Sequence, residues 1–105
     1  MEKMNEQISD RRAALGLYQG AVGEQSNMTQ QMYQRIESGG DCKLSSLERI
    51  AGALNCQLAM VPDEKMALVD IVLNAPNARV AAKRIEAYQK KVEKSVEEHT
   101  STKVA

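Results

Sequence analysis

Short helix-forming segments, each followed by a residue that tolerates a left-handed backbone, come one after another in the first half of this sequence. Residues 5–15 are followed by Gly16, residues 18–26 by Asn27, and residues 29–37 by Gly39. Gly and Asn adopt positive φ more readily than other residues, so they end helices and begin turns. Thr29 suits the N-cap of the third segment. The pattern predicts three short helices joined by tight turns.

The sequence is also poor in aromatic residues, with three Tyr and neither Phe nor Trp among 105 residues. Aliphatic side chains and Met must therefore fill the interior, and this favours packed helices over a sheet sandwich. We expect a mainly α fold, with one compact domain and an appended arm.

A fourth helix is indicated by apolar residues at helical spacing, which are Leu47, Ile50, Ala51 and Leu54. Ser45 or Ser46 is expected to cap it. The helical period is then lost in residues 56–61, which are predicted to form one short strand before Pro62.

Two further helices are predicted in the second half of the sequence, over residues 64–73 and 77–98. Residues 74–77 contain Pro76 and form a break between them. Residues 99–105 are expected to be frayed.

Charge and motif content exclude several classes of function. The formal net charge is zero, so any basic surface must come from local clustering. Cys42 and Cys56 lie fourteen residues apart without a CxxC motif, and we expect free thiols and no metal. No catalytic spacing or glycine-rich phosphate loop is present, which predicts a protein that is not an enzyme and needs no cofactor.

No long apolar run and no signal-peptide pattern occur in the sequence, so we expect a cytoplasmic protein without a membrane partner.

Five segments in order resemble the helix-turn-helix domain of lambda-type phage repressors, the Xre-like family. They are Gly16-Leu17-Tyr18-Gln19, Val22-Gly23, Asn27-Met28-Thr29, Arg35-Ile36-Glu37-Ser38-Gly39 and the run from Leu47 to Leu54. The resemblance covers roughly half of the chain. It implies a lambda-repressor-like helical bundle that binds double-stranded DNA through its third helix.

The outer face of the third helix carries the candidate base-reading residues, Gln30, Gln31, Gln34 and Arg35. Amide side chains suit the major-groove edge of adenine, and Arg suits guanine. The resemblance implies a phosphate contact for Gln19, and Thr29 and Lys43 are further candidate phosphate contacts. It also implies an ion pair between Arg12 and Glu37 that links the first and third helices.

The sequence departs from the family pattern at four positions, which are Tyr18, Gly20, Ser26 and Tyr33. Gly20 places a helix-weakening residue in the second helix. Ser26 stands where the family usually has an apolar residue. Tyr33 replaces a β-branched core residue, and the sequence leaves open whether it faces the core or lies partly exposed near the DNA.

The second half offers two candidate dimerisation devices. The lone strand, with Leu58 and Met60, has no partner within the chain, so pairing with a second copy would satisfy its backbone. The last helix carries Ile85, Tyr88 and Val92 at the alternating spacing of a helix–helix seam.

We therefore expect a DNA-binding domain over residues 1–55 and a dimerisation or partner-binding arm over residues 56–105. The leading hypothesis is a homodimeric transcriptional regulator, most simply a repressor, that binds palindromic operators. The alternative is an antitoxin that autoregulates its operon and neutralises a toxin, because the segment Leu58-Ala59-Met60-Val61-Pro62 resembles Xre-type antitoxins. A helical scaffold that acts only through protein contacts is a third possibility.

Overall fold

The computed structural model describes residues 1–104 and, within them, the side chains of residues 1–96. The described chain is helical and contains no strand. It divides into two compact units, Met1–Met60 and Val61–Ala105. The first unit contains α1 Met4–Ala14, α2 Gln19–Gln25, α3 Gln30–Glu37 and α4 Leu44–Ala53. The second contains the 3-10 turn η1 Asp63–Lys65, α5 Met66–Asn74 and α6 Ala78–Val104.

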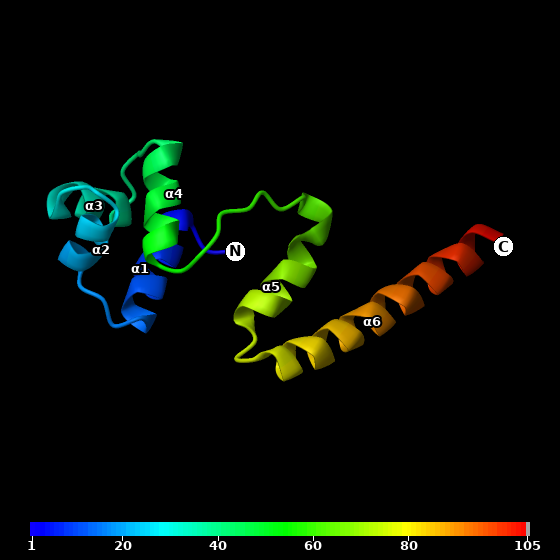
Figure 1. Cartoon of the computed structure of the whole chain (residues 1–105). Helices are drawn as coiled ribbons and strands as arrows, with labels where there is room; N and C mark the ends of the chain where they lie inside the picture. Colours follow the sequence, from blue (N-terminus) through cyan, green and yellow to red (C-terminus); the bar gives the residue numbers. More distant parts are fainter. Residues whose placement is uncertain (105) are drawn as a thin grey trace. The chain divides into compact units, whose positions relative to one another are not determined.

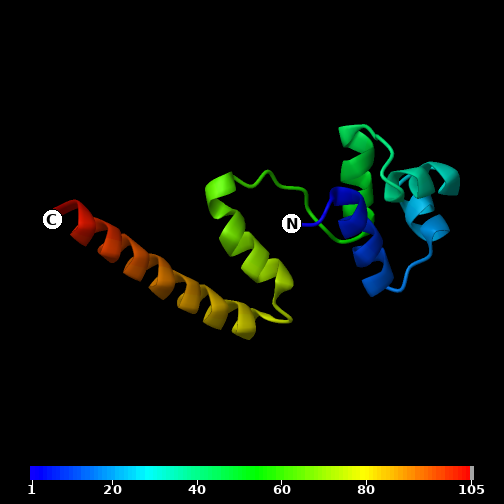
Figure 2. The same cartoon turned by 180° about the vertical axis from the view of Figure 1, so that it is seen from behind.

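The first unit is a bundle in which α2 packs on both α3 and α4, and α1 packs on α3 (Figures 1 and 2). Its core is one cluster of buried side chains contributed by all four helices, namely Ile8, Val22, Tyr33, Ile36, Ile50 and Leu54. Three of the four residues in the predicted stripe of α4 are buried, and Leu47 is partly buried against the same cluster. A mainly aliphatic core is therefore built as the composition predicts.

The predicted turn positions have the expected backbone conformation. Asn27 has a φ of 57°, and Gly16 and Gly39 have φ values of 69° and 98°. The Thr29 hydroxyl accepts a hydrogen bond from the Met32 amide at 3.1 Å, so Thr29 caps α3 as predicted. These short-range signals determine where α1, α2 and α3 end or begin.

The predicted serine cap of α4 is wrong. The helix begins at Leu44, and its N-cap residue is Lys43, whose side chain makes no capping hydrogen bond. Ser46 is buried within the first turn, and its hydroxyl accepts from Arg49 Nη2 at 3.3 Å. The serine therefore binds a side chain on its own helix rather than the orphan backbone amides.

The predicted strand over residues 56–61 is also wrong. Residues 56–62 have no regular secondary structure, and the Met60 side chain is 99% exposed. A strand requires hydrogen bonds to a neighbouring extended segment, and the described part of the single chain offers none. This segment is the link between the two units.

The second unit is a helical hairpin in which α5 packs on α6. Asn77 caps α6, because its Oδ1 accepts from the Val80 amide at 3.0 Å. The helix extends to Val104, beyond the predicted end at residue 98 and through most of the segment that was expected to be frayed. On α6, Ala81 is buried, while Ile85 and Tyr88 are half-buried. None of the described helices is long and apolar enough to cross a membrane.

Candidate nucleic-acid interface

A tight turn brings α2 and α3 into close contact. A Cβ atom on Gly23 would lie 3.3 Å from the Met28 carbonyl oxygen and 3.4 Å from that of Thr29, so only glycine fits without adjustment. Val22 beside it is fully buried, and the Ser26 carbonyl accepts from Arg49 Nε of α4 at 2.9 Å. The turn is therefore fixed by the close approach of α2 and α3 at Gly23 and by the hydrogen bond from α4, and the orientation of α3 is set by backbone packing.

The opposite face of α3 is open to solvent. All four candidate base readers, Gln30, Gln31, Gln34 and Arg35, are exposed, and so are the candidate phosphate contacts Thr29 and Lys43. Tyr33 and Ile36 on the inner face are buried. The helix thus has one face fixed in the core and one face of long polar side chains free for a partner.

Gly20 has a packing role that the sequence did not reveal. A Cβ atom at this position would lie 3.2 Å from Oε1 of Gln30, so the amide of Gln30 lies against the bare backbone of α2. The glycine that weakens α2 also leaves room for a candidate base reader at the start of α3.

A buried carboxylate connects the first three helices. Glu37 Oε1 accepts from Arg12 Nε at 2.5 Å and from the Tyr33 hydroxyl at 2.7 Å. Its Oε2 accepts from Gln19 Nε2 at 2.6 Å and from Arg12 Nη2 at 3.4 Å. The Glu37 side chain is only 6% exposed, so these hydrogen bonds replace its hydration. We call Arg12, Gln19, Tyr33 and Glu37 the Glu37 cluster.

Ionisation in this cluster follows from its contacts. Burial raises the pKa of the Glu37 carboxyl, but hydrogen bonds from Arg12, Gln19 and Tyr33 outweigh burial and hold the pKa below its ordinary value. Burial raises the pKa of the Tyr33 hydroxyl, and the neighbouring Glu37 raises it further. Arg12 also has a raised pKa, chiefly through its hydrogen bond to Glu37. The cluster at neutral pH is a carboxylate held by a guanidinium and two neutral donors.

A family model described as helix-turn-helix matches residues 8–61. The chain belongs to the lambda-repressor-like (Xre) helix-turn-helix family. As a member, it is a DNA-binding regulator of transcription in the general sense of that family. No curated protein and no solved structure matches the chain.

Within this helix-turn-helix unit, Arg12 and Glu37 are in direct contact, so α1 and α3 are linked. Gln19, which the resemblance assigned to a phosphate, has its amide nitrogen bound to Glu37. An amide nitrogen carries two hydrogens, so one donor remains for a second acceptor. Its phosphate contact stays a prediction.

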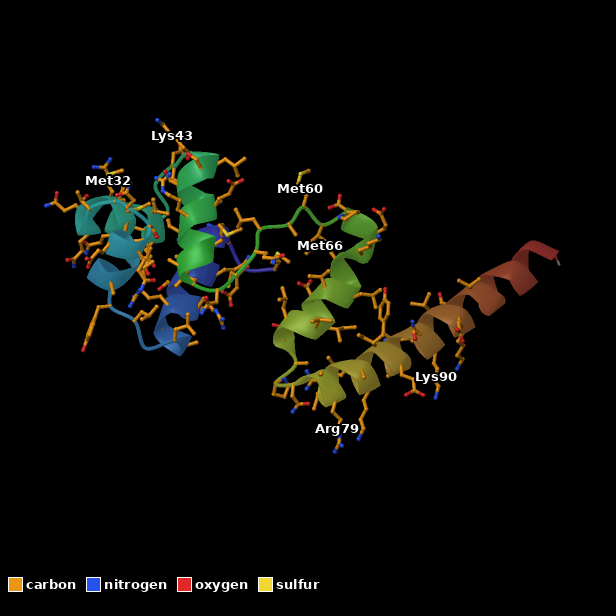
Figure 3. All side chains as sticks on the ribbon, in the orientation of Figure 1. Met32, Lys43, Met60, Met66, Arg79 and Lys90 are labelled. Atoms are coloured by element: carbon orange, nitrogen blue, oxygen red, sulfur yellow. The ribbon has the colours of Figure 1, made fainter. Side chains whose placement is uncertain are left out.

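A shallow hollow lies between α3 and α4 and carries three cationic residues, Arg35, Lys43 and Arg49, with one acid, Asp41. Met32 also lines it, and Figure 3 shows Met32 and Lys43 at this edge of the unit. Arg49 was not among the residues predicted from the sequence to contact phosphates. In the structure it lines this hollow and also binds the turn carbonyl of Ser26. Its position three residues after Ser46 on α4 was the available signal.

The sequence does not decide between core and surface for Tyr33, and in the structure its side chain is completely buried. Its hydroxyl joins the Glu37 cluster, so it orients the helix rather than facing DNA. Ser26 is also fully buried, and its hydroxyl has no hydrogen-bond partner among the described residues. The polar residue at this position therefore occupies an apolar site, as the family pattern suggests.

Proposed function

We propose that this helix-turn-helix protein reads a specific operator sequence with α3 and represses transcription as a homodimer. The observation that carries the proposal is the two-sided character of α3. Its inner face is fixed by Tyr33, Ile36 and the Glu37 cluster, while four long polar side chains project from the outer face. A rigid helix with a free polar face is what major-groove reading requires.

Each exposed side chain has chemistry that suits a base edge. An amide can donate to and accept from adenine, and this fits Gln30, Gln31 and Gln34. The guanidinium of Arg35 can donate two hydrogen bonds to guanine. Around this helix, Lys43, the Thr29 hydroxyl and the spare amide hydrogen of Gln19 are proposed to contact phosphates and fix the register.

Dimerisation is supported by an apolar helix that the hairpin covers only in part. Six of the nine residues of α5 are Met, Leu, Val or Ile, yet none is buried, and Val72 and Leu73 are 52% and 59% exposed. A helix that is apolar on most sides normally lies in an interior. A second copy of the chain covering α5 in a two-fold arrangement would remove this surface from water.

The residues predicted from sequence for the dimer remain proposals. On α6, Val92 is 40% exposed, while Ile85 and Tyr88 are half-buried. Leu58 and Met60 lie in the link between the units. A dimer would place two reading helices on half-sites about one helical turn apart, which is why a palindromic operator is expected. Binding to chromosomal DNA would also place the protein in the cytoplasm.

The test of operator reading is selection of bound fragments from the host genome, at about 100 mM salt, a concentration at which phosphate contacts alone bind weakly. The wild-type protein should enrich one palindromic sequence. A Gln30→Ala/Gln31→Ala variant should lose the enrichment, and a Gln57→Ala/Gln89→Ala variant, altered at exposed glutamines outside α3, should retain it. A folded wild-type protein that enriches no sequence would contradict the proposal.

The homodimer is tested separately by sedimentation equilibrium. Val72→Glu/Leu73→Glu places charges on the exposed apolar surface of α5 and should convert a dimer into a monomer, because a buried unpaired charge is costly. A wild-type protein that is monomeric at high concentration would contradict this part of the proposal.

The antitoxin function is the second candidate, and the same partly covered α5 favours it, since a toxin could cover its exposed residues instead of a second copy. Co-expression with the product of the adjoining gene distinguishes the two. A stoichiometric complex that Val72→Glu/Leu73→Glu abolishes would favour the antitoxin. A protein that stays a homodimer in the presence of that product would contradict it.

A further inference from the structure

A strongly basic face runs along α6, in a chain whose net charge is zero. Residues 78–96 contain six basic side chains and two acidic ones, Glu86 and Glu93, while the rest of α6 adds Glu97, Glu98 and Lys103. The six basic side chains of residues 78–96 are all exposed, and they are Arg79, Lys83, Arg84, Lys90, Lys91 and Lys94. The unit that contains the reading helix has no comparable excess, because residues 1–60 carry six basic and seven acidic side chains.

Four of the six cations form one stripe along the helix. Arg79, Lys83, Lys90 and Lys94 are separated by four, seven and four residues, which places them within about 60° of one another around the axis. The stripe is about 22 Å long at the rise of an α-helix. Arg84 and Lys91 extend the basic face on one side. We call these six residues the α6 basic face.

This face is not used by the hairpin itself. On α6, Ala81, Ile85 and Tyr88 lose exposure and share the other side of the helix. Val80 is also half-buried, and it lies among the cations of the basic face by helical spacing. Figure 3 shows Arg79 and Lys90 on the side of α6 away from α5. An ion pair is formed between Lys90 and Glu86 at 3.4 Å, and both side chains are mostly exposed, so this pair is weak.

We infer that the α6 basic face binds the phosphate backbone of duplex DNA, independently of sequence. This deepens the proposed function, on which it rests. The α6 basic face has no aromatic residue between its cations, and its apolar residues there are Ala87 and the half-buried Val80, so its binding energy would come mainly from charge. A regular polyanion provides such energy through the release of counterions.

The observations favour DNA over the other anionic partners. A helix that lies on a membrane must insert its apolar side, and here that side packs on α5. A specific acidic protein would need buried anchor residues that the basic face lacks. The two units are joined by the short link of residues 56–62, so a helix-turn-helix unit on DNA keeps α6 at a high local concentration of phosphates.

The test is the salt dependence of binding to a short random-sequence duplex, measured by fluorescence anisotropy with the full chain between about 50 and 200 mM salt. Lys83→Gln/Lys94→Gln removes two cations of the stripe. Lys3→Gln/Lys65→Gln removes two exposed lysines elsewhere and is the control of equal net charge. Circular dichroism verifies that each variant retains its helices.

The stripe variant should bind about 10- to 100-fold more weakly at 100 mM salt, and its slope of log K against log salt should fall by about 2 per chain. The control should match the wild type. Lys83→Arg/Lys94→Arg, which keeps both charges, should restore the affinity and the slope. Equal slopes for the stripe variant and the control would overturn the inference.

The outcome separates this inference from the proposed function. If genomic selection yields a palindrome and the stripe variant keeps the wild-type slope, the regulator stands and the basic face has no DNA role. If selection yields no sequence but the slope depends on Lys83 and Lys94, the basic face binds DNA and operator reading is contradicted. Binding to phosphatidylserine vesicles or to polyglutamate that is tighter than to the duplex would also overturn the inference.

Discussion

Replacing Glu37 by Gln tests how the reading helix is held in place. The change keeps the size of the side chain but removes the charge and one of the two acceptor oxygens. Arg12 would then be a cation with no anion beside it, and Arg12, Gln19 and Tyr33 would compete for a single oxygen. The links from α3 to both α1 and α2 would weaken together.

The expected loss of stability is large for a domain of this size. Removing one partner of a buried ion pair costs about 3 to 5 kcal/mol. Arg12 is 20% exposed, so water compensates part of its charge. We therefore expect a loss of about 2 to 3 kcal/mol for Glu37→Gln at neutral pH. A domain with the length of the unit Met1–Met60 has a total free energy of unfolding of only about 3 to 9 kcal/mol.

The assay is urea unfolding followed by far-ultraviolet circular dichroism, since the chain has no Trp. Glu48→Gln makes the same chemical change at an exposed glutamate of α4 and should alter stability by less than about 0.5 kcal/mol. Equal stability of the Glu37 and Glu48 variants would refute the reasoning, because it would mean that the Glu37 cluster contributes nothing net. A loss above that of the control but without weaker DNA binding would refute its role in orienting α3.

Three further outcomes follow from the same structure. Because folding lowers the pKa of Glu37, its contribution to the free energy of unfolding is complete above the ordinary pKa of glutamate, about 4.3, and is lost as pH falls through the lower folded value. In urea titrations from pH 7 to acid, Glu37→Gln should therefore lose less free energy of unfolding than the wild type. Equal losses would contradict the assignment. Ser26→Ala should raise the free energy of unfolding by about 1 kcal/mol, because it removes a buried hydroxyl without a partner. Ser38→Ala, at an exposed serine, is the control and should not raise the free energy of unfolding. Gly23→Ala should destabilise the fold by about 1 to 3 kcal/mol through contact with the Met28 and Thr29 carbonyls. The control Gly52→Ala, with open space around it, should stabilise the fold by about 0.5 to 1 kcal/mol. Stability changes of the same sign for both variants in thermal unfolding would show that the turn adjusts freely.

Local signals in the sequence were sufficient for the framework of the first unit. Asn27 and Gly39 end their helices through positive φ, and Thr29 caps α3 through its own hydroxyl. Each of these effects acts within a few residues, so it can be inferred without knowing the fold. The stripe of α4 was also predictable, because burial repeats with the period of the helix.

Features that depend on distant contacts were not predictable in the same way. The Tyr33 hydroxyl binds Glu37 only four residues away, but the burial of the Tyr33 ring depended on core side chains such as Ile8 and Ile50 that other helices bring near. The engagement of Gln19 by Glu37 joins residues eighteen apart in sequence. Residues 56–61 have the composition of a strand, but a strand also needs a neighbour to pair with, and sequence composition does not provide one. Only the three-dimensional arrangement could show these outcomes.

The central claim is that the exposed face of α3 reads DNA bases. The most direct measurement is the change in each assigned side-chain amide and backbone amide NMR shift when the protein binds its selected duplex. The account predicts the largest changes at the side-chain amides of Gln30, Gln31 and Gln34 and at the backbone of Arg35, with the side-chain amide of Gln57 unchanged. Tight binding that leaves the α3 signals in place and shifts other surfaces would contradict it.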